Sequence, residues 1–298
     1  MKTRHTIFAL IALSFLTASC GNDIKFDACG QIEATEVTVS AECSGKILEF
    51  DLEEGDEVEA GEVVGGIDSL QVLLQIQELK ERMAGAKSRM VDIKRQSEPD
   101  LGQLKSLEKD LTRYTNLLQS NAATPKQVDD IKDKIAILKA QIAARTQSWE
   151  RGNAGINSEI ATYTVQLAQK EDQLAKSRIT SPVTGTVLTK YVEKGESVTS
   201  GKPLFKIADL DNVFVRAYFT TSQLSGVKIG DRVTVIPDDG SASPKEYEGR
   251  IVSISSQAEF TPKNIQTRDE RADMVYAVKV ALDNDGSIRL GMYAYVRK

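Results

Sequence analysis

A stretch of 27 residues occurs twice in this chain, at a constant offset of 140 residues. Residues 41–67 read AECSGKILEFDLEEGDEVEAGEVVGGI, and residues 181–207 read SPVTGTVLTKYVEKGESVTSGKPLFKI. The matched positions are Gly45/Gly185, Leu48/Leu188, Glu53/Glu193, Gly55/Gly195, Val58/Val198, Gly61/Gly201 and Ile67/Ile207. A unit of this size is too small to enclose a core alone, so we expect the copies to pack together as one β-sandwich. The residues between them must then leave and return at nearly the same point.

The chain between the copies has the apolar periodicity of long helices. From Val72 to Leu118, and again from Val128 to Leu174, apolar residues recur at steps of three and four. Such steps are typical of a left-handed coiled coil, and the other faces are charged or polar, as a solvated surface should be. Residues 69–178 are therefore predicted to form an antiparallel helical hairpin, whose arms of about 50 residues would reach about 75 Å.

The string SNAATPKQ marks the turn of this hairpin. Thr124, Pro125 and Gln127 fit a capping box, in which the threonine hydroxyl accepts a backbone N–H, proline takes the first helical position and glutamine bonds back. The chain reversal is therefore expected near residues 120–124.

Two strings are expected to interrupt the arms. SEPDLG at 97–102 contains Pro99 and Gly102, and ERGNAG at 150–155 contains two glycines. Proline removes a backbone donor and glycine weakens a helix, so we expect both arms to break at roughly one level.

Residues 209–298 return to the alternation of strands. Five short runs, VFVRAYF, DRVTVIP, EGRIVSIS, MVYAVKVAL and MYAYV, are separated by turn residues, which is typical of a small antiparallel barrel. The early segment QIEATEVTVSAE is expected to add one more strand, so residues 21–40 are assigned to a linker and a barrel strand. The sandwich halves are placed at 41–68 and 179–208. The predicted fold is α+β and elongated: a split sandwich, an inserted helical hairpin and a β-barrel.

Residues 1–20 have the features of a secretory signal: Lys2 and Arg4, an apolar run too short to span a bilayer, and small residues before Cys20. This ending resembles the bacterial lipobox, in which the cysteine receives a diacylglycerol and becomes the new N-terminus, although Thr17 stands where leucine is usual. The alternative is an ordinary cleaved signal followed by a free cysteine. We expect Cys20 to be lipidated.

Composition argues against several classes of function. The formal charge is −5 and no basic run is present, so nucleic acid is not expected as a partner. The one histidine, His5, leaves with the signal, and the mature chain therefore lacks a histidine for a catalytic triad or a metal site. Cys29 and Cys43 form either a disulfide or two small apolar side chains, and their spacing does not decide between these. No enzyme activity, cofactor or metal is expected.

The repeated motif resembles the two halves of a biotinyl/lipoyl domain. In carrier proteins of that kind, a tight hairpin joins the halves and bears the lysine that takes the cofactor. Here the first half ends GGIDSLQV and runs straight into the predicted helix, with no lysine in such a hairpin. A cofactor-carrier function is therefore not expected.

A split lipoyl domain, a coiled-coil hairpin and a following barrel together resemble the periplasmic adaptor proteins of the HlyD, or membrane fusion, family. The stretch AEFTPKNIQTRDER at 258–271 is similar to the ABC-transporter-associated, YbhG-like branch, although its own role is expected to be that of a barrel loop. The resemblance implies a lipid-anchored periplasmic protein at the inner membrane of a Gram-negative bacterium. It would link an ABC transporter to a TolC-type outer-membrane channel for efflux or secretion, and self-associate into a ring.

The tip also resembles this family. Adaptors that dock on TolC-type channels often carry Arg, then Leu four residues on, then Ser eleven residues after the Arg. Arg113, Leu117 and Thr124 occupy those places, and threonine keeps the hydroxyl while adding a methyl group. The resemblance implies a channel-docking tip. The alternative is a solvated Arg113, a Leu117 packed in the seam and a Thr124 that only caps its helix.

Two other functions stay open. An RND-type efflux pump could replace the ABC transporter, although few residues follow the predicted barrel for the membrane-proximal domain of larger adaptors, which favours ABC. A structural coiled-coil lipoprotein would account for the heptads and the anchor but not for the split sandwich. The residues indicate neither the substrate nor the number of copies in a ring. With Gly21 after Cys20, they also leave open which membrane holds the anchor.

Overall fold

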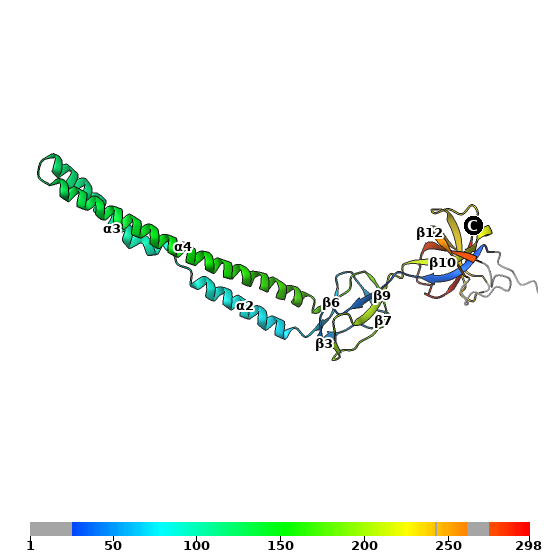
Figure 1. The fold of residues 1–298 in the computed structure, drawn as a ribbon. Helices are drawn as coiled ribbons and strands as arrows, with labels where there is room; N and C mark the ends of the chain where they lie inside the picture. Colours follow the sequence, from blue (N-terminus) through cyan, green and yellow to red (C-terminus); the bar gives the residue numbers. More distant parts are fainter. Residues whose placement is uncertain (1–25, 242, 261–273) are drawn as a thin grey trace, which may run out of the picture.

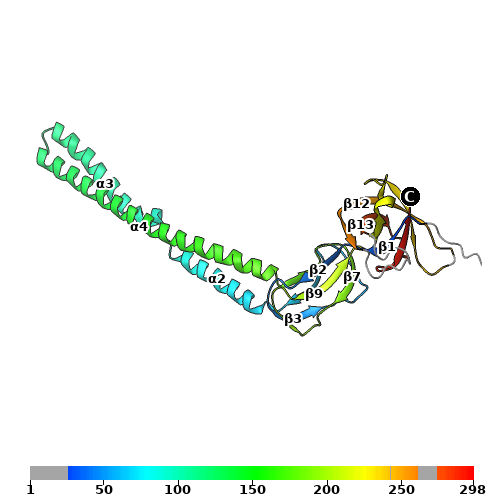
Figure 2. The ribbon, with the colours of Figure 1, turned by 45° about the vertical axis from the view of Figure 1, so that its right-hand side comes forward.

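The structure, a computed structural model, describes residues 26–241, 243–260 and 274–298. Its three parts follow one another along an elongated molecule, with the helical hairpin at one end, the β-sandwich in the middle and the β-barrel at the other end (Figures 1 and 2). The sequence predicted this α+β architecture, and the structure confirms it. No helix within the described ranges is long and apolar enough to cross a bilayer.

Each half of the sequence repeat contributes strands to both sheets of the sandwich. The strands are β2 (Glu36–Ser40), β3 (Gly45–Phe50), β4 (Glu57–Val58), β5 (Val63–Ile67), β6 (Arg178–Thr180), β7 (Gly185–Lys190), β8 (Ser197–Val198) and β9 (Pro203–Ala208). They form two four-stranded sheets, in the orders β2-β9-β7-β4 and β6-β5-β3-β8. The short strand β4 therefore pairs with β7 of the other half, and β8 pairs with β3.

The hydrogen bonds between the two halves are reciprocal. The Gly55 N–H donates to the Val187 carbonyl at 2.9 Å, and at the matching positions the Gly195 N–H donates to the Ile47 carbonyl at 2.9 Å. The φ angles of the two glycines are +98° and +93°, a region that glycine adopts at little steric cost. Each turn of one half is thus held by a strand of the other half, and this mutual completion accounts for the repeat.

The apolar residues that match between the copies form the core of the sandwich. The buried pairs are Ile47/Val187, Leu52/Val192, Val58/Val198, Val64/Leu204 and Ile67/Ile207. Packing leaves no room at Gly185, where an added Cβ would lie 2.4 Å from the carbonyl oxygen of Ala208. Glycine at this position therefore lets β7 approach β9.

Three helices build the hairpin: α2 (Leu70–Ser88), α3 (Ile93–Gln119) and α4 (Pro125–Ala175). The first two form the arm that leaves the sandwich, and α4 is the returning arm, continuous over 51 residues and about 75 Å long. The predicted seam residues are buried or half-buried, among them Ile76, Leu79, Met83, Ala86, Leu104, Leu107, Leu111, Val128, Ile135, Leu138, Ile142 and Ile160. The expected seam is confirmed.

The structure corrects the expected breaks. The outgoing arm is interrupted at residues 89–92 rather than at 97–102, and Pro99 lies inside α3. The returning arm runs through 150–155 without interruption. The new helix starts where a cap is available, because the Asp92 side chain accepts the N–H of Arg95.

A side chain of the unbroken arm satisfies the break in the other arm. Asn153 of α4 accepts the N–H of Val91 on its Oδ1 at 2.9 Å, and its Nδ2 donates to the Val91 carbonyl at 2.8 Å. Residues 150–155, which were expected to break α4, therefore supply the side-chain amide that hydrogen-bonds the backbone at the break in the outgoing arm. Both backbone groups of Val91 would otherwise lack their helical partners.

Six strands close the barrel. They are β1 (Ala28–Glu33), β10 (Asn212–Thr220), β11 (Arg232–Pro237), β12 (Tyr247–Phe260), β13 (Met274–Asp283) and β14 (Tyr293–Arg297), with the short helix α5 (Thr221–Leu224) after β10. Their order is β1-β10-β13-β12-β11-β14, and β14 pairs back with β1. Each of the five predicted runs forms one strand, and the sixth comes from the early segment, as expected.

The early segment contributes two strands where one was expected. β1 joins the barrel, but β2 pairs with β9 in the sandwich, with Val37 opposite Ile207. The sandwich therefore begins near residue 36 rather than at 41. Alternation alone could not assign β2 to a sheet, because its partner is distant in sequence and β preference depends on that context.

Candidate functional site

The far end of the hairpin is a compact chain reversal that satisfies its own backbone groups. Helix α3 ends in a Schellman motif: the Ala122 N–H donates to the Leu117 carbonyl at 2.8 Å and the Asn121 N–H donates to the Leu118 carbonyl at 3.0 Å. Asn121 takes the left-handed conformation that this motif needs, with φ of +56°. This end signal was not predicted from the sequence, although asparagine shortly after the last apolar seam residue is a known helix stop.

The start of α4 follows the predicted capping box. The Gln127 N–H donates to the Thr124 hydroxyl at 3.4 Å, and the Thr124 N–H donates to the Gln127 side-chain oxygen at 2.8 Å. Pro125 occupies the first helical position. The reversal therefore lies at 120–124, as expected, and both helix ends are fixed by local hydrogen bonds.

Arg113 lies on the exposed surface two turns before the reversal. Its guanidinium is 3.0 Å from Asp110 and 5.4 Å from the centre of the Tyr114 ring, and its side chain is 64% exposed. An ion pair this exposed contributes little to stability. Arg113 can therefore exchange Asp110 for an acidic group of a partner at small cost.

Leu117 lies one helical turn after Arg113 and is also exposed, at 37%. The seam at this level is made by Leu111, Tyr114 and Leu118, which are half-buried. Residues four apart share one face of a helix, so Arg113 and Leu117 form a cationic and apolar pair on the outer side of the tip.

Thr124 begins the other arm and is exposed, with its hydroxyl engaged in the capping box. The three tip residues thus combine a cation, an apolar side chain and a capped turn on a rigid support. This arrangement suits recognition of a protein surface.

Two ion pairs join the arms near the break at 89–92. At the start of the break, Arg89 contacts Glu159 at 2.5 Å, and beyond it Arg145 contacts Asp100 at 2.7 Å. Both pairs join the outgoing arm to α4. The Asn153 amide lies between these two pairs along α4 and bonds the same two arms.

The sandwich carries one nearly buried cation. The Lys190 side chain is 8% exposed, contacts Glu193 at 2.8 Å and Glu53 at 3.2 Å, and lies over the Phe50 ring. The hydrogen bond to Glu193 is the main cause that raises the pKa of Lys190. Since its two carboxylate partners come from the two halves of the repeat, this lysine helps to join the halves.

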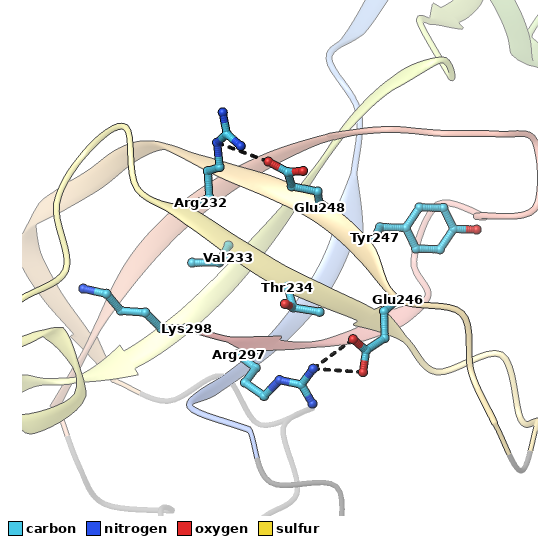
Figure 3. A pocket seen from close by; sticks show the side chains of 8 residues that line it. All are labelled: Arg232, Val233, Thr234, Glu246, Tyr247, Glu248, Arg297 and Lys298. Atoms are coloured by element: carbon cyan, nitrogen blue, oxygen red, sulfur yellow. Dashed lines mark hydrogen bonds and ion pairs between the residues drawn. The ribbon is translucent and has the colours of Figure 1, made fainter.

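The barrel has a hollow of about 450 Å³ on its outer surface, over β11 (Figure 3). Two ion pairs cross it: Arg232 with Glu248 at 3.2 Å, and Arg297 with both oxygens of Glu246 at 2.9 Å. The other lining residues are Val233, Thr234, Tyr247 and Lys298. Because the guanidinium groups already have carboxylate partners, the hollow does not have the character of an anion site.

Several expected residues lie elsewhere or outside the described ranges. Cys29 in β1 and Cys43 before β3 do not form a disulfide with each other, and burial is the main cause that raises the pKa of Cys43. Cys20 lies outside the described residues, as does most of the stretch 258–271. Among the residues that the structure describes, no group of histidine, cysteine, aspartate and glutamate side chains is arranged to hold a metal ion.

Comparison with known proteins gives a family match over more than half of the chain. The family model described as RND MFP, barrel-sandwich hybrid domain, matches residues 35–210. A UPF0194 membrane protein of Yersinia pseudotuberculosis is 27% identical over 297 residues, covering 93% of this chain and 90% of that protein. Another UPF0194 membrane protein, from Acidithiobacillus ferridurans, is 27% identical over 308 residues and covers 95% of this chain and 89% of that protein.

Solved structures share the fold. MacA from Actinobacillus actinomycetemcomitans matches with a TM-score of 0.57 and 22% identity, over 90% of this chain and 76% of that chain. A membrane fusion protein from Streptococcus pneumoniae R6 matches with a TM-score of 0.54 and 17% identity, over 90% of this chain and 96% of that chain. At these sequence identities, the similarity shows a shared fold and nothing further.

Proposed function

The chain belongs to the RND MFP family of membrane fusion proteins, and we propose that it is a periplasmic adaptor of a tripartite efflux or secretion system. It links an inner-membrane ABC transporter to a TolC-type outer-membrane channel. Its action is mechanical and conformational: movement of the transporter is coupled to engagement of the channel, and the path between them is sealed. In this proposal the chain has no enzymatic activity and needs no cofactor.

The length of the hairpin and its position carry the proposal. Helix α4 is unbroken over 51 residues, about 75 Å, and projects from the sandwich away from the barrel (Figure 1). A membrane anchor ahead of β1 would hold the barrel near one membrane and place the tip far from it. An elongated chain of this kind bridges two membranes.

The tip is proposed as the surface that docks on the channel. Arg113 and Leu117 are exposed on one face, and the Thr124 cap holds the adjoining turn. Arginine is favoured at protein interfaces, where an apolar neighbour adds buried area. Several copies side by side would present a ring of such tips, with the outer faces of sandwich and hairpin as the contacts between copies.

Lipidation of Cys20 is proposed to hold the protein at the periplasmic face of the inner membrane. The support is the lipobox-like ending of residues 1–20. Cys20→Ala is expected to move the protein from the membrane fraction to the soluble periplasmic fraction. Retention of the variant in membranes would contradict the anchor.

An RND-type pump is the second candidate for the inner-membrane partner, because the matching family model carries the RND name. The ABC partner is supported by the resemblance of residues 258–271 to the YbhG-like branch. The two partners differ in composition: an ABC system contains an ATPase, and an RND pump does not.

The deciding experiment is crosslinking of the tagged protein in cells, followed by mass spectrometry of the material that co-purifies. Recovery of an ATPase, its membrane subunits and an outer-membrane channel would support the proposal. An RND pump in place of the ATPase would keep the adaptor function and overturn the ABC partner. Recovery of the protein alone would favour a structural coiled-coil lipoprotein.

The same experiment tests the tip. Arg113→Asp is expected to reduce recovery of the channel at least about tenfold, because the substitution reverses a charge at the contact, while the transporter is still recovered. Arg82→Asp is the matched control: Arg82 is 56% exposed and pairs with Glu78 within α2, as Arg113 pairs with Asp110 within α3. Equal recovery of the channel with both variants would remove the docking role of Arg113.

A further inference from the structure

The end of the barrel opposite the sandwich carries exposed apolar side chains around its edge. Because neighbouring strands are antiparallel, this end is formed by the start of β1, β11 and β13 and by the end of β10, β12 and β14. The opposite end joins the sandwich, since β1 leads into β2 and β9 leads into β10. We call the outer end the distal rim and define its apolar residues as Phe26, Ile229, Phe260 and Met274.

The four side chains are exposed to different degrees. Phe260 is 79% exposed, Ile229 is 65% exposed, Met274 is 51% exposed and Phe26 is 36% exposed. Phe260 and Met274 face each other at the end of the β12–β13 ladder. Phe26 lies before β1, which is separated from β12 by two strands on either path around the barrel. The apolar residues are therefore distributed around the rim rather than gathered on one side.

Three carboxylates at or near the rim have a cationic or hydrogen-bond-donating partner within the barrel domain. Asp231 is 3.1 Å from the Lys298 ammonium, and Asp27 accepts the Lys298 N–H at 2.8 Å. Glu259, next to Phe260, receives two hydrogen bonds from Arg216 at 3.1 and 3.2 Å. Asp231 and Glu259 are thus paired with cations and Asp27 with a backbone donor, which lowers the cost of removing these three carboxylates from bulk water.

The chain ahead of the rim limits its distance from the membrane. Five residues, 21–25, separate Cys20 from Phe26. A fully extended segment spans at most about 3.6 Å per residue, so six steps reach about 20 Å. If Cys20 carries the proposed lipid, Phe26 cannot lie farther than this from the headgroups.

We propose that the distal rim is a lipid-contacting surface, in which Phe26, Ile229, Phe260 and Met274 enter the boundary between headgroups and acyl chains. This inference rests on the proposed anchor at Cys20. A single acylated residue gives a flexible tether, and a ring of apolar side chains adds a second membrane contact. With two contacts, the long axis of the molecule stands away from the bilayer and the hairpin points outward.

The distribution of the residues favours lipid over a protein partner. A protein interface concentrates its binding energy in a central packed cluster, whereas the apolar side chains here are spaced around a closed barrel edge. A bilayer is a continuous apolar surface that can receive separate side chains at one depth. The two alternatives can be distinguished by a probe at the rim, which would lie next to acyl chains in one case and next to a polypeptide in the other.

The test uses the full lipidated protein in vesicles of phosphatidylethanolamine and phosphatidylglycerol with brominated acyl chains. In a Trp149→Phe background, which removes the only native tryptophan, Phe260→Trp and Phe26→Trp place single reporters on opposite parts of the rim. Bromine quenches tryptophan on contact, so both reporters are expected to lose emission and shift to the blue. Ile137→Trp is the control, because Ile137 is 58% exposed on α4, far from the barrel, and should keep its emission.

The outcomes separate the rim from the anchor. If the protein binds vesicles but the reporter at 260 is not quenched, the rim contact is overturned and the anchor stands. Quenching at 26 alone also overturns the rim contact, because the lipid tether by itself brings residue 26 close to the bilayer. Quenching at both positions in protein that mass spectrometry shows to lack lipid supports the rim and overturns the anchor. Protein that stays free of vesicles overturns both. A polypeptide captured in cells by a photo-crosslinker at 260, without quenching in vesicles, assigns the rim to a protein partner and overturns the proposal.

Discussion

Asn153 holds both backbone polar groups of Val91, with 2.9 Å from the Val91 N–H to Oδ1 and 2.8 Å from Nδ2 to the Val91 carbonyl. The two residues are 62 positions apart in sequence and lie on opposite arms of the hairpin. An amide side chain is suited to this task because it offers one acceptor and two donors side by side. The break between α2 and α3 is therefore fixed at one level of α4.

Asn153→Ala is expected to destabilise the hairpin by about 1–3 kcal/mol, because two partly buried backbone groups lose their partners. Chemical unfolding followed by circular dichroism of the helices measures this. Gly152→Ala is the matched control: no atom lies within 4 Å of the added Cβ, and alanine in a helix should raise stability by up to about 1 kcal/mol. A stability of Asn153→Ala equal to that of the unaltered protein would contradict the role of the amide.

Gly185→Ala is expected to destabilise the sandwich by about 2–3 kcal/mol, because the new Cβ forces the backbone of β9 away. The contact is with a carbonyl oxygen, at 2.4 Å, and not with a side chain that can turn aside. Gly66→Ala in β5 is the control, with no atom within 4 Å of its Cβ and an expected change below about 1 kcal/mol. Similar losses in both variants, measured by thermal unfolding, would refute the close approach of β7 and β9.

Thr124→Ala should loosen the tip while leaving the rest of α4 folded. Loss of an N-cap hydroxyl costs about 1 kcal/mol, so hydrogen exchange of the Gln127 amide should quicken about fivefold. Thr124→Ser keeps the hydroxyl and should exchange like the unaltered protein. If the serine variant exchanges as fast as the alanine variant, the methyl group rather than the hydroxyl stabilises the turn.

We expect the Asp209 carboxylate to contribute to a loss of stability of the folded protein in acid. It accepts hydrogen bonds from the Asp211 N–H, the Asn212 N–H and the Asn212 side chain at 2.8–3.1 Å, and the Asn212 side-chain bond is the main cause that lowers its pKa. A carboxylate with a lowered pKa stabilises the fold above its unfolded pKa of about 3.9, and this contribution is lost as the pH falls through the folded value.

The measurement is the melting temperature as a function of pH. Asp209→Asn should be less stable than the unaltered protein near neutral pH, and the gap should narrow below about pH 4. Asp211→Asn changes the same charge two residues away and is the control. A gap that stays constant down to strong acid would show that Asp209 acts through packing and not through its charge.

The parts of the fold that follow from local or repeated signals were predictable from sequence. The offset of 140 residues identified the sandwich, the seam of α3 and α4 followed the apolar spacing, and Thr124 and Gln127 identified the turn. The seam and the capping box are patterns among residues close in sequence, and the sandwich is marked by a repeat. None of them requires knowledge of which distant residues will be in contact. The roles proposed for Arg113 and Leu117 came from a family resemblance, because an exposed residue pair has no local signature.

The parts that depend on distant partners were not predictable. Pro99 was expected to end a helix, but propensity is a weak preference that packing against α4 overrides. The actual break depends on Asn153, and no local pattern links that residue to Val91. Strand β2 has the same alternation as a barrel strand, and only its pairing with β9 assigns it to the sandwich.

The closure of the barrel by its first and last strands has a consequence for the order of folding. Ala28 pairs with Val296, so the ladder between β1 and β14 requires nearly the whole chain. The sandwich also cannot form until its second half has been added to the chain, because Gly45 pairs with Val198, which follows the inserted hairpin in sequence. A chain that enters a compartment from its N-terminus can therefore form the hairpin first from local contacts, which are fast, and must complete both β-domains late and slowly. Until the last strand arrives, β1 presents unpaired backbone edges, and the growing chain is most open to aggregation in that interval.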